Sequence, residues 1–105
     1  MPTPASEPDV VVIGGGLVGS AVAYGLARGG ARVVMLDEGD IAYRASRGNF
    51  ALVWVQSKGA GMPEYAAWTQ NSARLWPSLA RLLQADAGID VALHQPGGFS
   101  FALSD

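Results

Sequence analysis

Three glycines and one carboxylate are the residues of this chain whose spacing points to chemistry. Gly14, Gly16 and Gly19 form a G-x-G-x-x-G pattern directly after an apolar run. Asp37 follows Gly19 at close to the ~20-residue spacing expected of an acid that binds a ribose. This combination is typical of a dinucleotide-binding turn, in which glycine backbone approaches a pyrophosphate at the N-terminus of a helix.

Each residue of the pattern has its own expected role. Gly14 permits the tight turn out of a strand, Gly16 leaves room for the pyrophosphate, and Gly19 lets the helix lie close to the strand. Asp37 would accept hydrogen bonds from an adenosine ribose, with Glu38 as the alternative acid. A carboxylate at this position disfavours a 2′-phosphate, so NADP is not expected. The glycine pattern alone does not separate FAD from NAD.

The residues around the pattern predict a strand–helix–strand unit. Residues 9–13 contain an unbroken β-branched run, which is typical of a buried strand. Apolar residues at helical spacing follow from Leu17, and the glycines at 29–30 end the predicted helix. Residues 31–36 form a second apolar strand. Two strands joined by a helix are expected to run parallel, which makes the fold class α/β with an N-terminal Rossmann-like βαβ unit.

A long helix is predicted from about Pro63 to Gly88. We read it as one helix kinked at Pro77, with two abutting helices as the alternative. Its main apolar stripe is expected to be core rather than a ligand site. The stripe consists of Tyr65, Trp68, Ser72, Leu75, Leu79 and Leu82, widened by Trp76 and Leu83.

Two further apolar stretches have expected structures. Residues 50–55 form either a short strand or a buried loop. Residues 91–94 and 99–103 flank a Gln-Pro-Gly-Gly turn and predict a β-hairpin, the start of an antiparallel domain. We therefore expect a flexible tail at 1–8, a nucleotide-binding unit with its long helix at 9–88, and the start of a substrate domain at 89–105.

The composition excludes several classes of function. The 105 residues contain seven basic and nine acidic side chains, and no basic patch suggests a nucleic-acid partner. The absence of cysteine fits a cytoplasmic protein, and no metal site is expected. Residues 10–27 are uncharged, but their glycines oppose a membrane-spanning helix. The residues before them lack the positive charge of a secretory signal.

The stretch after the second strand resembles a known family. DEGDIAYRASRGNFALVWVQ is similar to the corresponding segment of the FAD-dependent amino-acid oxidase and dehydrogenase family, including D-amino-acid dehydrogenase, glycine oxidase and sarcosine oxidase. The match includes a small-Ser-x-x-Asn loop at 45–49 and a Gly-Gly pair at 97–98. In its detail the stretch most resembles opine oxidase, D-hydroxyproline dehydrogenase and hydrogen cyanide synthase subunits. The resemblance favours FAD over NAD.

The resemblance implies ten cofactor-binding residues. They comprise the glycine turn for the pyrophosphate, acids for the ribose, a hydroxyl and a cation along the phosphates, and an amide near the flavin. The alternative for Arg44 and Arg47 is that they are solvated loop charges. In the order given, the ten residues are Gly14, Gly16, Leu17, Val18 and Gly19; Asp37 and Glu38; Ser46 and Arg47; and Asn49.

The implied reaction is oxidation of an amine or amino-acid C–N bond by hydride transfer to flavin. No catalytic residue can be assigned, and His94 is read as structural or exposed. The chain is expected to be an N-terminal fragment that folds poorly alone and holds FAD weakly. The alternatives are an NAD-dependent dehydrogenase, or a non-catalytic nucleotide-binding subunit of a heteromeric dehydrogenase with partner subunits.

Overall fold

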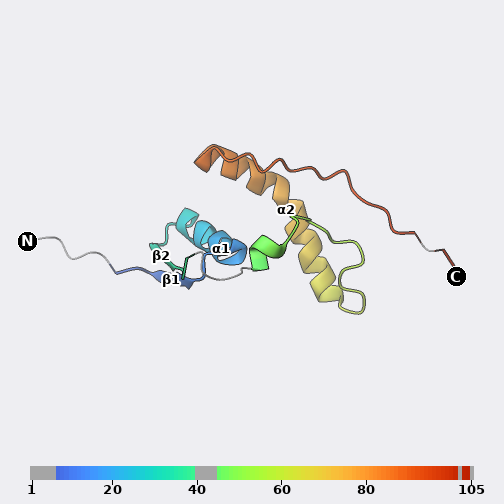
Figure 1. Cartoon of the computed structure of the whole chain (residues 1–105), viewed down its shortest axis with the longest axis horizontal. Coiled ribbons are helices and arrows are strands. Elements are labelled where there is room, and N and C mark those ends of the chain that lie inside the picture. Colours follow the sequence, from blue (N-terminus) through green and yellow to red (C-terminus); the bar gives the residue numbers. More distant parts are fainter. Residues whose placement is uncertain (1–6, 40–44, 102, 105) are drawn as a thin grey trace, which may run out of the picture. The chain divides into compact units, whose positions relative to one another are not determined.

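The structure, a computed structural model, describes residues 7–39, 45–101, 103 and 104. The chain divides into two compact units, Met1–Ala51 and Leu52–Asp105. The first unit contains the glycine pattern, and the second contains the long helix (Figure 1). The tail predicted at 1–8 lies largely outside the described residues, and the predicted domain division after residue 88 stays a prediction.

The first unit is the predicted βαβ unit. Strand β1 (Val10–Ile13) leads into helix α1 (Leu17–Arg28), and strand β2 (Val33–Leu36) follows. The strands pair in parallel, in a register that places Ile13 beside Leu36. The β-branched runs favour strands because such side chains fit a pleated surface. The α/β fold class and the parallel arrangement are therefore confirmed.

Helix α1 covers one face of the two-stranded sheet. In β1 the exposure of the side chains alternates, with Val10 and Val12 half-buried and Val11 and Ile13 exposed. Val12 lies on the face toward the helix, because its Cγ1 would be 3.5 Å from a Cβ added to Gly19. Among the described residues no side chain is fully buried. The sheet thus has one face under α1 and one exposed face.

An ion pair joins the starts of the two strands. The Asp9 carboxylate accepts hydrogen bonds from the Arg32 guanidinium through both oxygens, at 2.6 and 3.0 Å, and from the Arg32 backbone N–H at 2.8 Å. These bonds hold the pKa of the Asp9 carboxyl below its ordinary value and raise the pKa of Arg32. Neither residue was predicted to form a pair from the sequence.

Both helices end where glycine follows. α1 ends at Arg28, and Gly30 then adopts a φ of 91°, which suits a residue without a side chain. In the second unit, helix α2 (Pro63–Ala87) ends at Gly88, whose φ of 67° is left-handed. Both predicted ends are confirmed.

Helix α2 is one continuous element. Pro63 occupies its first turn, where a missing N–H costs nothing, and Pro77 lies inside it. The axis of α2 changes direction part-way along in Figure 1, as expected for a helix that lacks one N–H donor and accommodates a proline ring. Although α2 has 25 residues, neither it nor another helix in the described part is long and apolar enough to cross a membrane.

The predicted core stripe of α2 is mostly exposed among the described residues. Trp68 is 70% exposed, and Tyr65, Leu75 and Leu82 are also exposed. The half-buried residues of α2 include three members of the predicted stripe, Trp76, Leu79 and Leu83, and four residues of an adjoining sector of the helix. They are Ala66, Thr69, Ala73, Trp76, Leu79, Ala80 and Leu83.

The predicted hairpin is not formed. Residues 88–101 contain neither helix nor strand, and Gln95 donates its side-chain N–H to the Ala73 carbonyl of α2 at 3.0 Å. An isolated two-stranded hairpin is marginally stable in water, so without further strands the apolar pattern does not fold as predicted. Residues 50–55 form a loop rather than a strand, with only Val53 and Val55 half-buried.

Candidate dinucleotide site

The turn between β1 and α1 depends on two glycines for different reasons. Gly14 has a φ of 104°, which a residue with a side chain rarely adopts, and its N–H donates to the Leu36 carbonyl at 2.8 Å. At Gly19 an added Cβ would lie only 1.9 Å from the Gly14 carbonyl oxygen. Gly19 therefore allows the first turn of α1 to approach the turn that leaves β1.

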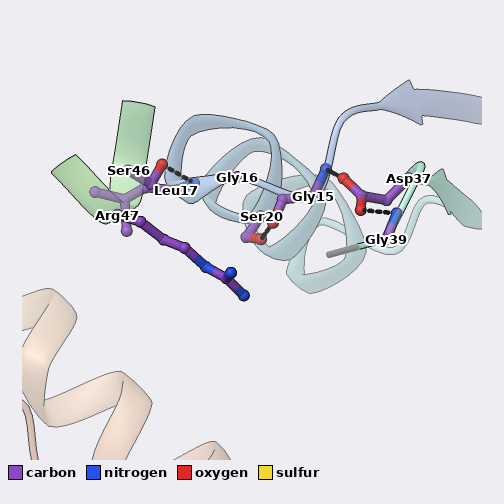
Figure 2. A pocket seen from close by; sticks show the side chains of 8 residues that line it. All are labelled: Gly15, Gly16, Leu17, Ser20, Asp37, Gly39, Ser46 and Arg47. Carbon is purple, nitrogen blue, oxygen red and sulfur yellow. Dashed lines mark hydrogen bonds between the residues drawn. The ribbon is translucent and has the colours of Figure 1, made fainter. Parts of the chain in front are cut away.

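Asp37 reaches across to the glycine turn from the end of β2. Its Oδ2 accepts the Gly15 N–H at 2.6 Å, and its Oδ1 accepts the Gly39 N–H at 2.8 Å. The carboxylate is fixed by amides on both sides and lies at the edge of the turn (Figure 2). An acid held in this way is placed to receive the hydroxyls of a bound sugar.

Ser46 approaches the N-terminus of α1 from a short 3₁₀ helix, η1 (Ala45–Gly48). Its Oγ accepts the Leu17 N–H at 2.8 Å, which satisfies one of the free amides of the first helical turn. The helix has no capping side chain at Gly16 itself. A Cβ added to Gly16 would lie 3.2 Å from the Ser46 Oγ. Gly16 thus gives η1 room to approach the helix.

These groups surround an open hollow of about 580 Å³. Figure 2 shows Ser46 at one end of the glycine turn and Asp37 at the other. The volume lies within the usual range of ligand sites, ~300–1,000 Å³. The residues that line it are Gly15, Gly16, Leu17, Ser20, Asp37, Gly39, Ser46 and Arg47.

Half of the predicted site residues line the hollow. Among those outside it, Gly14 and Gly19 shape the turn, and the Asn49 Oδ1 accepts its neighbour's N–H, from Phe50, at 2.9 Å. Arg44 lies outside the described residues. The predicted residues that line the hollow are Gly16, Leu17, Asp37, Ser46 and Arg47; those that do not are Gly14, Val18, Gly19, Glu38 and Asn49.

Three residues of the hollow were not predicted from the sequence. Gly15 and Gly39 enter it because their amides bind Asp37, and Ser20 lies one turn into α1, with its Oγ 3.4 Å from the Gly15 carbonyl. The x position of a G-x-G pattern does not require glycine, so the sequence did not indicate that Gly15 belongs to the site. The position of Ser20, one residue after the last glycine of the pattern, is the signal that could have identified it.

The chemistry of the hollow fits a dinucleotide. A helix N-terminus, a hydroxyl and the Arg47 guanidinium favour an anion at one end, and the Asp37 carboxylate favours sugar hydroxyls at the other. The lack of side chains at Gly15 and Gly16 lets a ligand approach the backbone. No group of three or more metal-binding side chains occurs among the described residues. The hollow thus has the chemistry of a site for a sugar diphosphate.

Comparison with known proteins agrees with this class of site. Residues 9–105 match the family described as FAD dependent oxidoreductase. The chain therefore belongs to this family of flavin-dependent redox enzymes. No solved structure matches the chain.

Individual relatives give a finer comparison. The chain is 57% identical over 99 residues to an opine oxidase subunit of Agrobacterium tumefaciens (strain Ach5), and 52% identical over 99 residues to the same opine oxidase subunit of Rhizobium meliloti. Glycine oxidase of Bacillus subtilis (strain 168) is 29% identical over 97 residues. The first two matches cover 94% of this chain and 27% of each relative, and the third covers 92% and 26%. The chain thus spans about a quarter of the length of these relatives.

Proposed function

We propose that the hollow binds the ADP half of FAD and that the chain is the nucleotide-binding part of an amine- or amino-acid-oxidising flavoenzyme. The observation that carries the proposal is the pairing of Ser46 and Asp37 at opposite ends of one glycine turn. The Ser46 end offers hydrogen-bond donors to phosphates, and the Asp37 end offers an acceptor to the hydroxyls of a ribose. Membership of the FAD dependent oxidoreductase family supports FAD over NAD as the ligand.

In the proposed complex, N–H and cationic groups would bind the phosphates and a carboxylate would bind the ribose. Leu17 would donate its N–H to a phosphate oxygen of the ligand. The Ser46 hydroxyl, which accepts that N–H at 2.8 Å in the structure, would either donate to the same phosphate oxygen or move aside. Arg47 would add a cation beside the phosphates. Asp37 would accept hydrogen bonds from the adenosine ribose, and Gly14 and Gly19 would keep the turn in its shape. Val18 would bind the pyrophosphate through its backbone, Glu38 would lie beside Asp37 as the alternative ribose acid, and Asn49 would lie near the flavin.

The reaction proposed for the whole enzyme is oxidation of a C–N bond in an amine or amino acid. Bound FAD would supply the acceptor for the hydride that leaves the substrate carbon. The relatives named as opine oxidase subunits support a small amino-acid-derived substrate and a heteromeric enzyme. A nucleotide-binding subunit that does not itself meet the substrate is the second candidate, because those names describe one component of an oxidase.

Calorimetric titration tests the ligand. The protein to use is a chimera in which this chain replaces the matching 99 residues of the A. tumefaciens opine oxidase subunit, alongside the 105-residue chain itself. FAD and ADP are expected to compete for one site, and NADH is not expected to bind. Tight NADH binding without FAD binding would overturn the proposal.

A pair of arginine variants tests the phosphate end. Arg47→Gln should weaken FAD binding and reduce its dependence on salt, because one charge beside the phosphates is lost. Arg28→Gln is the matched control, since Arg28 lies at the opposite end of α1. Turnover of the chimera with an artificial electron acceptor, across amino acids, imino acids and opines, then separates an enzyme from a protein that only binds nucleotide.

A further inference from the structure

Pro77 deprives one carbonyl of α2 of its usual helical donor. In a regular α-helix the carbonyl of residue 73 accepts the N–H of residue 77, and proline has no N–H. The Ala73 carbonyl accepts the side-chain N–H of Gln95 at 3.0 Å. A side chain from beyond the end of α2 thus supplies the donor that the proline lacks.

Gln95 belongs to a segment that turns back along α2. Gly88, with a φ of 67°, reverses the direction of the chain, and the Ile89 N–H donates to the Leu83 carbonyl at 3.4 Å. Residues 88–98 form neither helix nor strand, and they return along α2 as far as Ala73 (Figure 1). We refer to residues 88–98 as the strap.

The lengths of helix and strap explain why residue 95 meets the kink. Residues 73–87 rise by ~21 Å along the axis of a helix. Residues 88–95 span ~23–25 Å when fully extended. The two lengths match, so the number of residues in the strap sets which side chain arrives beside Ala73.

The strap makes a second contact beyond Gln95. A Cβ added to Gly98 would lie 2.6 Å from the Gln56 Nε2, so the backbone at Gly98 lies directly against that side chain. Gly97, the other residue of the Gly-Gly pair, has a φ of 90°. The bond of Gln95 to α2 therefore fixes the chain immediately before this pair.

We propose that Gln95 and the Ala73 carbonyl form a releasable contact that holds the strap, with its Gly97–Gly98 pair, on the proline kink of α2. The hydrogen bond is exposed to water, so by itself it favours the docked strap by only ~2- to 12-fold. A preference of this size leaves a released strap populated. A ligand or a neighbouring segment that prefers one state would shift the populations. The inference does not depend on the proposed ligand.

Hydrogen exchange of the glutamine side-chain amides, followed by NMR in the chimera labelled with ¹⁵N-glutamine, tests the contact. The Gln95 amide should exchange ~2- to 12-fold more slowly than that of Gln84. Gln84 is an exposed residue of α2 whose side chain has no hydrogen bond within the described part of the chain. Pro77→Ala supplies the missing N–H and should bring Gln95 close to the rate of Gln84. Because alanine suits a helix better than proline, this variant should also raise the thermal midpoint, so a failure to fold does not explain the result.

A double-mutant cycle gives a second measurement. Gln95→Met removes the donor and should lower the thermal midpoint of the chimera by ~1–3 °C. In the Pro77→Ala background the same substitution should have less than half this effect. Gln84→Met is the matched control and should leave the midpoint unchanged. The proposal is overturned if Gln95 exchanges as fast as Gln84, if Pro77→Ala leaves the protection of Gln95 unchanged, or if the two substitutions act independently.

Discussion

The carboxylate of Asp37 accepts the Gly15 N–H at 2.6 Å, although the two residues lie at the ends of different strands. The acid at the end of β2 and the glycine turn at the end of β1 are therefore parts of one hydrogen-bonded structure. The other carboxylate oxygen of Asp37 accepts the Gly39 N–H at 2.8 Å. The ribose end of the proposed site is thus set before a ligand arrives, which lowers the ordering cost of binding.

Removal of the carboxylate should weaken binding of the adenosine moiety. Asp37→Ala is expected to weaken ADP binding by about 10- to 150-fold, since a hydrogen bond to a charged group contributes ~1.5–3 kcal/mol. Glu38→Ala tests the alternative acid, which does not line the hollow, and should change the affinity by less than about threefold, within ~0.6 kcal/mol. A loss in Glu38→Ala without one in Asp37→Ala would assign the ribose contact to Glu38. Calorimetry with ADP and with 2′,3′-dideoxy-ADP separates the ribose contact from a change in the turn. An equal loss for both ligands would contradict the ribose role.

Gly19 and Gly25 are two glycines of α1 with opposite expected responses to alanine. Gly19→Ala places a Cβ 1.9 Å from the Gly14 carbonyl oxygen, so the helix must shift, at a cost of ~1–3 kcal/mol. Gly25→Ala meets no atom within 4 Å and should stabilise the helix by up to ~1 kcal/mol. Thermal unfolding followed by circular dichroism measures both. A tolerated Gly19→Ala would show that α1 does not lie this close to the turn.

Loss of the Ser46 hydroxyl should loosen the start of α1. Ser46→Ala removes the acceptor of the Leu17 N–H, and loss of a helix-capping acceptor costs ~0.5–2 kcal/mol. Ser20→Ala, which removes only a 3.4 Å contact, should have a smaller effect. Hydrogen exchange of the Leu17 amide reports the difference directly. Unchanged exchange in Ser46→Ala would mean that the hydroxyl does not hold the amide in solution.

The ion pair of Asp9 and Arg32 should make the first unit sensitive to acid. The pKa of the Asp9 carboxyl is lowered in the folded state, so its contribution is complete above the ordinary pKa of ~3.9. The contribution is lost as the pH falls through the lowered folded pKa. The difference in thermal midpoint between the native chain and Asp9→Asn should therefore be largest near neutral pH and shrink below about pH 4. Arg32→Met should shrink the same difference, and a difference that grows in acid would refute the assignment.

The βαβ unit was predictable because its determinants are local. The β-branched runs specify the strands, the helical periodicity specifies the helix, and the glycines at 29–30 specify the helix end. Because the crossover between parallel strands is right-handed, only one arrangement of the two strands and the helix is then expected. The same holds for α2, whose start at Pro63 and end at Gly88 are marked by residues with restricted or special backbone geometry.

The predictions about packing were less successful. The spacing of Trp68 and Leu75 indicates which side of α2 is apolar, but burial depends on polypeptide that lies opposite, and the described residues leave this side exposed. The predicted hairpin likewise needs neighbouring strands. In the site, chain spacing located Asp37 and Ser46 but not Gly39, because an amide that orients a carboxylate has no side-chain signature.

The parallel register of β1 and β2 has a consequence for how the chain tolerates change in length. The ladder pairs Ile13 with Leu36, so the residues that follow the two strands lie side by side at the same end of the sheet. A slip by one residue would move Asp37 by ~3.3 Å and point it to the opposite face. An insertion at the Gly29–Gly30 turn would leave the ladder untouched. The connection is therefore the place to introduce a peptide tag or a fluorophore, while a single deletion inside either strand should abolish the site.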